Sequence, residues 1–228
     1  MLEEPEVGAD LIAADRALGR AVRARLSHGG AALDAQAIAL RPTLTGLGAV
    51  ERAVLKAVAG RILAAERLVA AAGPVAQLLV ADRFGGAARI HPTAEAALKA
   101  AAVGLTLIDA EGLGPWWARL LARPDLAVVG ALPDDPASGP RALLVGAGGV
   151  GPTGEDRTFW VSDSPASDAR VLAALETAGL VAAPCASAGG LKLFMLTGYV
   201  QREDPRLDDP AVARLGRLSG VIGHAPVL

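Results

Sequence analysis

The stretch Leu191–Thr197, LKLFMLT, is the most strand-like segment of this sequence. It is a short run of large apolar residues, which is typical of a buried β-strand. Apolar runs and helical patterns flank it on both sides. Working outward, the predicted elements are strand 158–162, helix 168–178, strand 180–186, strand 191–197, helix 210–218 and strand 221–228. This order, βαββαβ, predicts a split ferredoxin-like arrangement for the last third of the chain.

Strand and helix patterns also alternate in the middle of the chain, after the helix-ending pair Gly73-Pro74. The predicted strands are 75–81, 105–108, 126–132 and 142–145, and the predicted helices are 93–102 and 116–122. Such alternation favours a short α/β layer.

The first third of the chain has the 3.6-residue periodicity of helices. In the stretch 11–26, one helix face collects Leu11, Ile12, Leu18, Val22 and Leu26. Arg25 lies at the edge of this apolar face and Asp15 lies on it, and a charge on a packing face is costly unless it has a partner or a ligand. Two more helices are predicted over 32–40 and 49–72, the second with Lys56 on its solvated face.

The sequence therefore predicts an α+β protein with three domains. Residues 1–73 form a helical bundle, residues 74–151 a short α/β layer, and residues 152–228 a ferredoxin-like βαββαβ domain. The glycine-rich segment 146–151 fits G-x-G-x-x-G, but no helix follows it to bind a pyrophosphate, so we interpret it as a hinge between domains.

Composition narrows the classes of function. The 228 residues carry a net charge of −2, which indicates no nucleic-acid partner, and no apolar stretch is long enough to span a membrane. The first residues lack the basic and apolar regions of a secretory signal, so we expect a cytoplasmic protein. Cys185 is the single cysteine and the three histidines are far apart in the sequence, so no metal site is expected.

Several segments together resemble a known fusion of enzymes. Residues 11–25 are similar to the first helix of the all-α chorismate mutases, with Arg25 at the position of a carboxylate-binding arginine, and Arg41-Pro42 matches the Arg-Pro of that family. Residues 94–108 and Pro115-Trp116-Trp117 resemble prephenate dehydratases. Residues 220–226 resemble the end of an ACT domain.

This resemblance implies a homodimeric isomerase of aromatic amino acid biosynthesis that rearranges chorismate to prephenate without a cofactor. The expected catalytic residues are Arg25, Gln36 and Arg41, and the expected substrate-binding residues are Arg25 and Arg61. Arginine suits such a substrate because its planar guanidinium binds carboxylates in a bidentate way. The small-molecule partner would be chorismate, prephenate or an aromatic amino acid.

The sequence also departs from the family pattern. Gln36 stands where the family has a lysine that binds the ether oxygen, and Gly8 stands where it has a further arginine. Only part of a dehydratase substrate domain is present, so dehydratase activity is not expected. An alternative hypothesis is a non-catalytic regulatory, ligand-binding or dimerisation protein of the same pathway. Arg25 could then pair with Asp15 of a partner helix.

Overall fold

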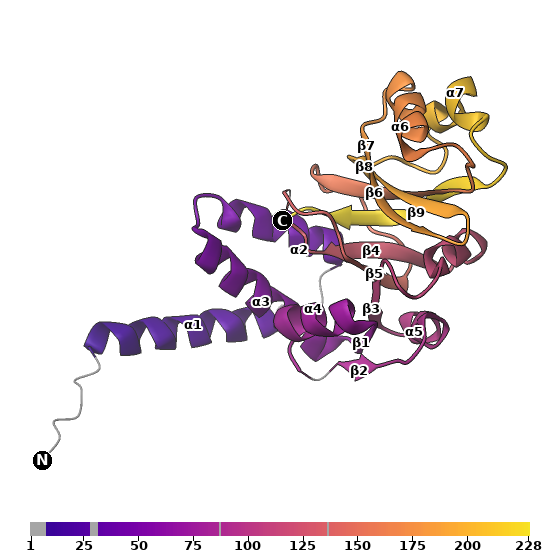
Figure 1. Ribbon diagram of the computed structural model, residues 1–228. Coiled ribbons are helices and arrows are strands. Elements are labelled where there is room, and N and C mark those ends of the chain that lie inside the picture. The colour runs from indigo at the N-terminus through magenta and orange to yellow at the C-terminus, as the bar shows by residue number, and fades with distance from the viewer. Residues whose placement is uncertain (1–7, 28–31, 87, 136) are drawn as a thin grey trace, which may run out of the picture.

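The computed structural model describes residues 8–27, 32–86, 88–135 and 137–228. Its centre is one mixed β-sheet, and three N-terminal helices lie at one side of it (Figure 1). The sheet has nine strands in the order β2-β1-β3-β5-β4-β9-β6-β8-β7. Strand β9, which follows the other eight described strands in the sequence, therefore lies in the middle of the sheet.

The first half of the sheet is built from the middle of the sequence. Strands β1, β2 and β3 are parallel, and β5 joins β3 and β4 in antiparallel fashion. Helices α4 and α5 connect the parallel strands, and the 3₁₀ helix η1 precedes β4. The bounds are β1 Val69–Ala72, α4 Pro74–Phe84, β2 Arg89–Ile90, α5 Ala94–Ala101, β3 Leu105–Asp109, η1 Trp116–Ala122, β4 Leu126–Leu132 and β5 Ala142–Ala147.

The second half continues the same sheet. In the order β9, β6, β8 and β7, each strand is antiparallel to its neighbour, and α6 and α7 pack together beside them. Strand β9 pairs with β4 in parallel, around Val128 and Gly223. The bounds are β6 Asp156–Ser162, α6 Asp168–Thr177, β7 Ala182–Ala188, β8 Leu191–Thr197, η2 Pro205–Asp208, α7 Pro210–Ala213 and β9 Ser219–Pro226.

The fold class predicted from the sequence is wrong. A helical bundle beside a separate ferredoxin-like ACT domain was expected, whereas the chain folds as an α/β protein around one continuous sheet. The physical reason is β9, which pairs with β6 on one side and with β4 on the other, so the C-terminal strands have no free edge there. The domain boundaries at residues 73 and 151 stay a prediction.

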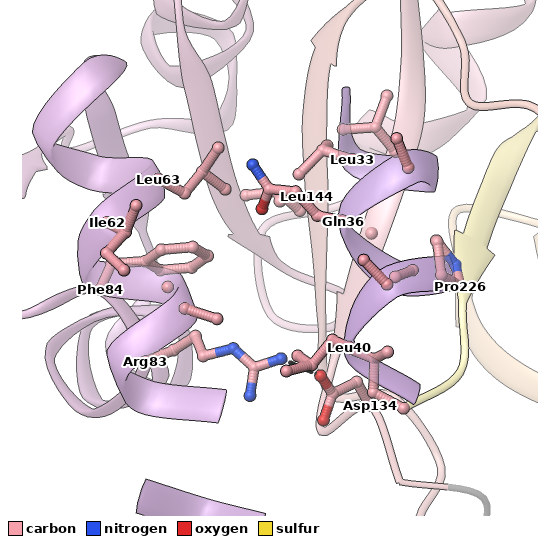
Figure 2. Close-up of a pocket in the computed structure, with 18 of the residues that line it drawn as sticks. Leu33, Gln36, Leu40, Ile62, Leu63, Arg83, Phe84, Asp134, Leu144 and Pro226 are labelled. Atoms are coloured by element: carbon pink, nitrogen blue, oxygen red, sulfur yellow. Dashed lines mark hydrogen bonds and ion pairs between the residues drawn. The ribbon is translucent and has the colours of Figure 1, made fainter. Parts of the chain in front are cut away.

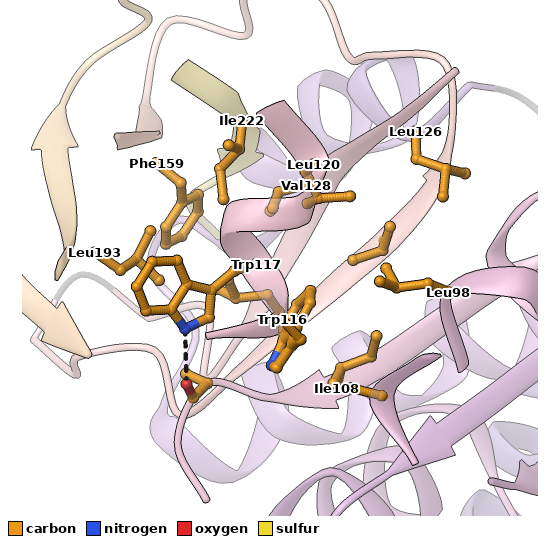
Figure 3. Close-up of a cluster of buried hydrophobic side chains, with 14 of the residues drawn as sticks. Leu98, Ile108, Trp116, Trp117, Leu120, Leu126, Val128, Phe159, Leu193 and Ile222 are labelled. Carbon is orange, nitrogen blue, oxygen red and sulfur yellow. Dashed lines mark hydrogen bonds between the residues drawn. The ribbon is translucent and has the colours of Figure 1, made fainter. Parts of the chain in front are cut away.

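The core also crosses the junction between the two halves. Figure 3 shows Trp117 between side chains of the first half, such as Ile108, and side chains of the second half, such as Phe159 and Leu193. Trp116 and Trp117 are both buried, and their indole N–H groups donate to the backbone oxygens of Asp109 and Ala110 at 2.7 and 3.2 Å. Shared burial of this kind makes separate unfolding of the halves costly.

The three N-terminal helices are α1 Ala9–Ser27, α2 Leu33–Leu44 and α3 Ala49–Glu66. Helix α1 agrees with the prediction, and the stop signal expected at residues 28–30 lies outside the described residues. Helix α2 runs past Arg41 and through Pro42, and the buried Leu44 holds its last turn against the protein. Figure 1 shows α1 reaching away from the sheet, with its C-terminal end near α3.

Two predicted elements in this region are wrong. The end of the long helix predicted over 49–72 is strand β1, and the strand predicted over 75–81 is helix α4. A short apolar run does not distinguish a buried strand from a buried helix. Pro74 occupies the first turn of α4, where its missing N–H costs no helical hydrogen bond.

Candidate functional site

A groove lies between the N-terminal helices and the sheet. Its cavity volume is about 430 Å³, within the range of small-molecule sites. Helices α2 and α3 and the end of α4 form its walls, β4 and β5 its floor, and the C-terminal end of α1 reaches its rim. Figure 2 shows Phe84 and Ile62 on one wall and Leu40 on the facing wall.

The sequence explains why this groove is apolar. Helix α2 turns Ala37 and Leu40 inward, and α3 turns Gly60 and Leu63 inward. Gly60 is required here because a Cβ atom at this position would collide with the backbone oxygen of Arg83 on α4. The small residues bring α3 and α4 close together, so the space that remains is a groove between α2 and the α3–α4 pair.

An ion network closes one end of the groove. The carboxylate of Asp134 accepts from Lys56 at 2.9 Å and from Arg83, and all three side chains are largely buried. Lys56 also donates to the backbone oxygen of Leu228 at 2.6 Å. Because Asp134 has a cation on each of its oxygens, these charges are satisfied within the protein. The network ties α3, α4 and the segment after β4 together.

Two of the predicted site residues lie at the groove. Arg25, near the end of α1, and Gln36, half-buried on α2, both line it. Arg25 is exposed, and it has no ion-pair or hydrogen-bond partner among the described residues. It is therefore a cation at the mouth of an apolar groove with its guanidinium available.

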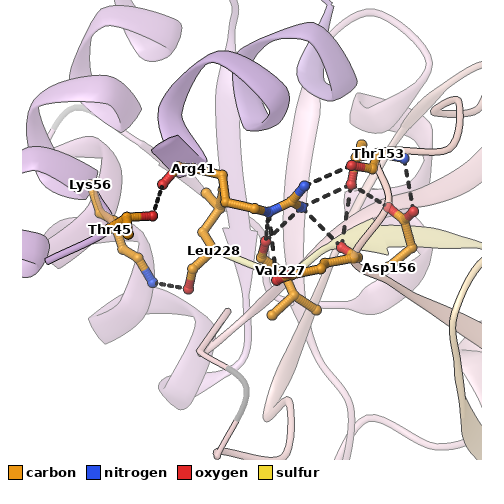
Figure 4. A network of polar contacts seen from close by, with 8 residues as sticks. Arg41, Thr45, Lys56, Thr153, Asp156, Val227 and Leu228 are labelled. Carbon is orange, nitrogen blue, oxygen red and sulfur yellow. Dashed lines mark hydrogen bonds and ion pairs between the residues drawn. The ribbon is translucent and has the colours of Figure 1, made fainter. Parts of the chain in front are cut away.

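The other two predicted residues do not lie there. Arg61 is exposed on α3 and is not among the residues that line the groove, although its neighbours Gly60 and Ile62 are. Arg41 points toward the C-terminal segment, as Figure 4 shows. It donates to the backbone oxygens of Thr153 at 2.6 Å, Val227 at 2.9 Å and Glu155 at 3.1 Å. Its guanidinium thus anchors α2 to the sheet.

A second place where an anion could bind is already occupied by the protein. In open α/β sheets, anions bind at helix N-termini beside the carboxyl ends of parallel strands. Here the N-terminus of α4 follows β1, and the backbone N–H groups of Val75 and Ala76 donate to the carboxylate of Asp109 at 3.2 and 2.5 Å. Asp109 comes from the end of the neighbouring strand β3 and caps the helix.

The groove offers little covalent chemistry. The described residues that line it include no serine, threonine, cysteine or histidine. No group of three or more His, Cys, Asp or Glu side chains among the described residues could hold a metal ion. Cys185 lies elsewhere, near Pro140, and burial raises the pKa of its thiol to about 12. The groove thus offers apolar contacts, an arginine, an amide and the carboxylate of Glu66, which lies among its lining residues.

Sequence reasoning missed the ion network and Phe84. Lys56 was expected on a solvated face, whereas it is buried with Asp134. Lys56, Arg83 and Asp134 are far apart in the sequence, and only the folded sheet brings them together. Gly60 within a helix was the one local signal of a close contact between helices.

Comparison with known proteins identifies a solved structure with a similar fold, but it does not assign this chain to a family. No protein-family model and no curated protein matches this chain. Among solved structures, the quorum-quenching acylase GqqA has a TM-score of 0.50 at 17% identity, covering 72% of this chain and 96% of that chain. At this identity the likeness establishes a shared fold over that length.

A prephenate dehydratase from Streptococcus mutans is a weaker neighbour, with a TM-score of 0.41 at 14% identity, covering 71% of this chain and 100% of that chain. A likeness at this level carries no conclusion about activity. Neither neighbour is a chorismate mutase. No described helix combines the length and apolarity needed to cross a bilayer, and the cellular location stays a prediction.

Proposed function

We propose that this chain is a ligand-binding protein whose groove takes a small molecule with an apolar body and a carboxylate. The observation that carries the proposal is Arg25, a cation without a partner among the described residues, at the mouth of an apolar groove. The walls supply Leu40, Leu63 and Phe84 for the apolar body. Such a ligand combines burial of apolar area with one charge-assisted pair.

The class of ligand follows from this pairing of features. An aromatic or cyclic carboxylate of about ten to sixteen non-hydrogen atoms matches the cavity volume. Phenylalanine, tyrosine, tryptophan, prephenate and chorismate all combine a ring with a carboxylate. Gln36, half-buried on the opposite wall, would add an amide contact to a polar group on the ring.

A thermal-shift experiment with these five compounds tests the proposal. A ligand that binds the folded state alone stabilises the protein by about 2.7 kcal/mol at a concentration 100 times its dissociation constant. We expect at least one compound to raise the melting temperature. We also expect Arg25→Ala to weaken binding by about tenfold or more, because a hydrogen bond to a charged group contributes roughly 1.5–3 kcal/mol.

The matched control is Arg23→Ala. Arg23 is exposed on the same helix but does not line the groove, so its variant should bind as the wild type does. If no compound shifts the melting temperature, or if both variants lose binding equally, the proposal is wrong.

A second candidate function is a chorismate mutase, favoured by the presence of Arg25 and Gln36 in one groove. The rearrangement is unimolecular and needs a bound conformer and donors at the ether oxygen, without a nucleophile. Gln36 would donate to that oxygen. Arg41 supports α2 in this scheme and does not touch substrate, since its donors are bonded to backbone oxygens.

Chorismate consumption separates the two candidates. Binding of chorismate without turnover supports the ligand-binding function. Turnover that falls at least about tenfold in both Arg25→Ala and Gln36→Ala supports the mutase, since each loses a group placed for the transition state.

A further inference from the structure

A hollow lies between α6 and α7, away from the groove (Figure 1). Its cavity volume is about 680 Å³, within the range of small-molecule sites. Apart from Leu215, its apolar lining consists of alanine and proline, which come from both helices and from the segment before α6. Because these side chains are short, the two helices pack against each other and still leave an open space between their outer faces.

Helix α6 turns one charged residue, Arg170, to this hollow. At 100° per residue, the other α6 residues that line the hollow fall within about 60° of Arg170 on the helix. The acids of α6, Asp168 and Glu176, fall about 160° and 120° away from Arg170 and are not among the lining residues. Asp168 pairs instead with Lys192, at 2.8 Å. This face of α6 therefore carries a cation and no acid.

Arg214, the residue that follows α7, supplies a second cation. Both Arg170 and Arg214 line the hollow and are exposed, and neither guanidinium has an ion-pair or hydrogen-bond partner among the described residues. The described lining of the hollow contains no Asp or Glu. The groove differs in this respect, because Glu66 and Asp134 lie among its lining residues beside the arginines. The hollow thus holds two positive charges and no acid within the described part of the chain.

The position of Arg170 is unfavourable in the absence of an anion. Ser167 caps α6 and its side chain accepts from the backbone N–H of Arg170, so Arg170 belongs to the first turn of the helix. The helix dipole gives this end a partial positive charge, which opposes a cation and favours an anion. Pro165 and Ala166, which precede this turn, also line the hollow. An anion bound in the hollow near these residues would remove the conflict between Arg170 and the dipole.

The two guanidinium groups are the side-chain donors that the hollow offers to a ligand. The hydroxyl of Thr177, which also lines the hollow, donates to the backbone oxygen of Ala173 at 2.8 Å. A planar guanidinium binds a carboxylate or a phosphate through two parallel N–H···O bonds. A phosphate monoester has nearly two negative charges at neutral pH and three acceptor oxygens, so it can bind both arginines at once. A single carboxylate has one charge and two oxygens.

We propose that the hollow between α6 and α7 binds a small phosphate monoester, with the phosphate group between Arg170 and Arg214 and the organic group on the alanine and proline lining. This site is separate from the groove and does not rest on the function proposed for the groove. Val171 and Val212 hold the two helices in one buried cluster. The exposed arginines can therefore be changed while the fold and its melting temperature are kept.

Isothermal titration calorimetry of the whole chain with phenyl phosphate, at about physiological ionic strength, tests the site. We expect saturable binding. Arg170→Ala and Arg214→Ala should each weaken binding by about tenfold or more, because each removes charge-assisted hydrogen bonds to the phosphate. The matched control is Arg217→Ala. It removes the same charge from an exposed residue that does not line the hollow, so it should bind as the wild type does.

Benzoate and a variant of the groove separate this site from its alternatives. Benzoate has the same ring with one carboxylate, and it should bind at least about tenfold more weakly than phenyl phosphate. Arg25→Ala should bind phenyl phosphate as the wild type does, because Arg25 lies at the groove. Absence of saturable binding, equal weakening by Arg170→Ala and Arg217→Ala, equal affinities for the two compounds, or loss of binding in Arg25→Ala would overturn the proposal.

Discussion

Arginine has two opposite uses in this protein. Arg41 donates its N–H groups to backbone oxygens of the segment around Thr153 and to Val227, so it acts as part of the scaffold. Arg25, on the rim of the groove, makes no such bonds with the described residues. Both residues were expected to be catalytic from the sequence, and only their surroundings separate an anchor from a candidate ligand-binding group.

His224 is the residue for which a pH effect is expected. It is buried on β9, stacks on Tyr199 with ring centroids 4.0 Å apart, and its Nε2 lies 2.9 Å from the backbone oxygen of Val200. Burial lowers the pKa of its imidazole, against the opposing effects of the Val200 oxygen and Asp156. The neutral form is thus favoured in the folded state.

A lowered pKa means that the unfolded chain takes up a proton first as the pH falls. The contribution of His224 to stability is therefore complete above the unfolded pKa of about 6.5 and is lost below it. We expect the free energy of unfolding, measured with urea at pH 7.5 and pH 5.5, to fall less in His224→Gln than in the wild type. An equal fall in both proteins would contradict the assignment.

At the scale of elements, the contact between β3 and α4 fixes the edge of the sheet. Asp109 ends β3, and its carboxylate accepts from two backbone N–H groups in the first turn of α4. Gly73, before this turn, has a φ of +96°, and a Cβ atom there would collide with Asp109. Both the glycine and the acid are therefore needed for the chain to pass from β1 into α4.

Asp109→Ala should lower the free energy of unfolding by about 2 kcal/mol, since loss of a helix cap costs about 0.5–2 kcal/mol and leaves buried donors unsatisfied. Chemical denaturation followed by circular dichroism measures this change. Glu95→Ala is the matched control, because Glu95 is an exposed acid in the first turn of α5 whose ion pairs are on the surface. Its removal should cost less than about 1 kcal/mol. A similar loss in both variants would mean that the cap contributes nothing specific.

Some helices and strands could be predicted from sequence patterns and others could not. Strand β8 was predicted over the same residues, 191–197, because its apolar residues are large and its ends are marked by glycine. Strand β1 was missed because VAAA carries almost no pattern. Helix α4 was predicted as a strand because its apolar run is short and the meaning of Pro74 at a helix start was overlooked.

At the scale of the molecule, the pairing of β4 with β9 makes one sheet out of two halves. Gly223 lies at this pairing with a φ of +143°, and a Cβ atom there would collide with the backbone of Val128. No local pattern reveals such a long-range pairing, and this is why the C-terminal third was predicted as a domain of its own. The groove was predicted only in part for a similar reason, since its floor comes from strands of the sheet.

Gly223→Ala should destabilise the whole protein by roughly 2–4 kcal/mol, through backbone strain and a steric clash at the junction. Urea unfolding followed by tryptophan fluorescence reports on the junction through Trp117 and on the C-terminal half through Trp160. Gly220→Ala is the control, because the nearest atom there is the end of the flexible Leu121 side chain. Equal midpoints for the two variants would show that the junction tolerates a Cβ atom.

The position of β9 has a consequence for synthesis of the chain. Strand β9 lies between β4 and β6 in the sheet. Until a ribosome has added residues 219–226, β4 and β6 therefore each lack this neighbour. Their backbone N–H and C=O groups then form two open edges, which are templates for pairing with other chains. The nascent protein thus keeps two aggregation-prone edges until β9 emerges, and a chaperone that shields strand edges would act at that stage.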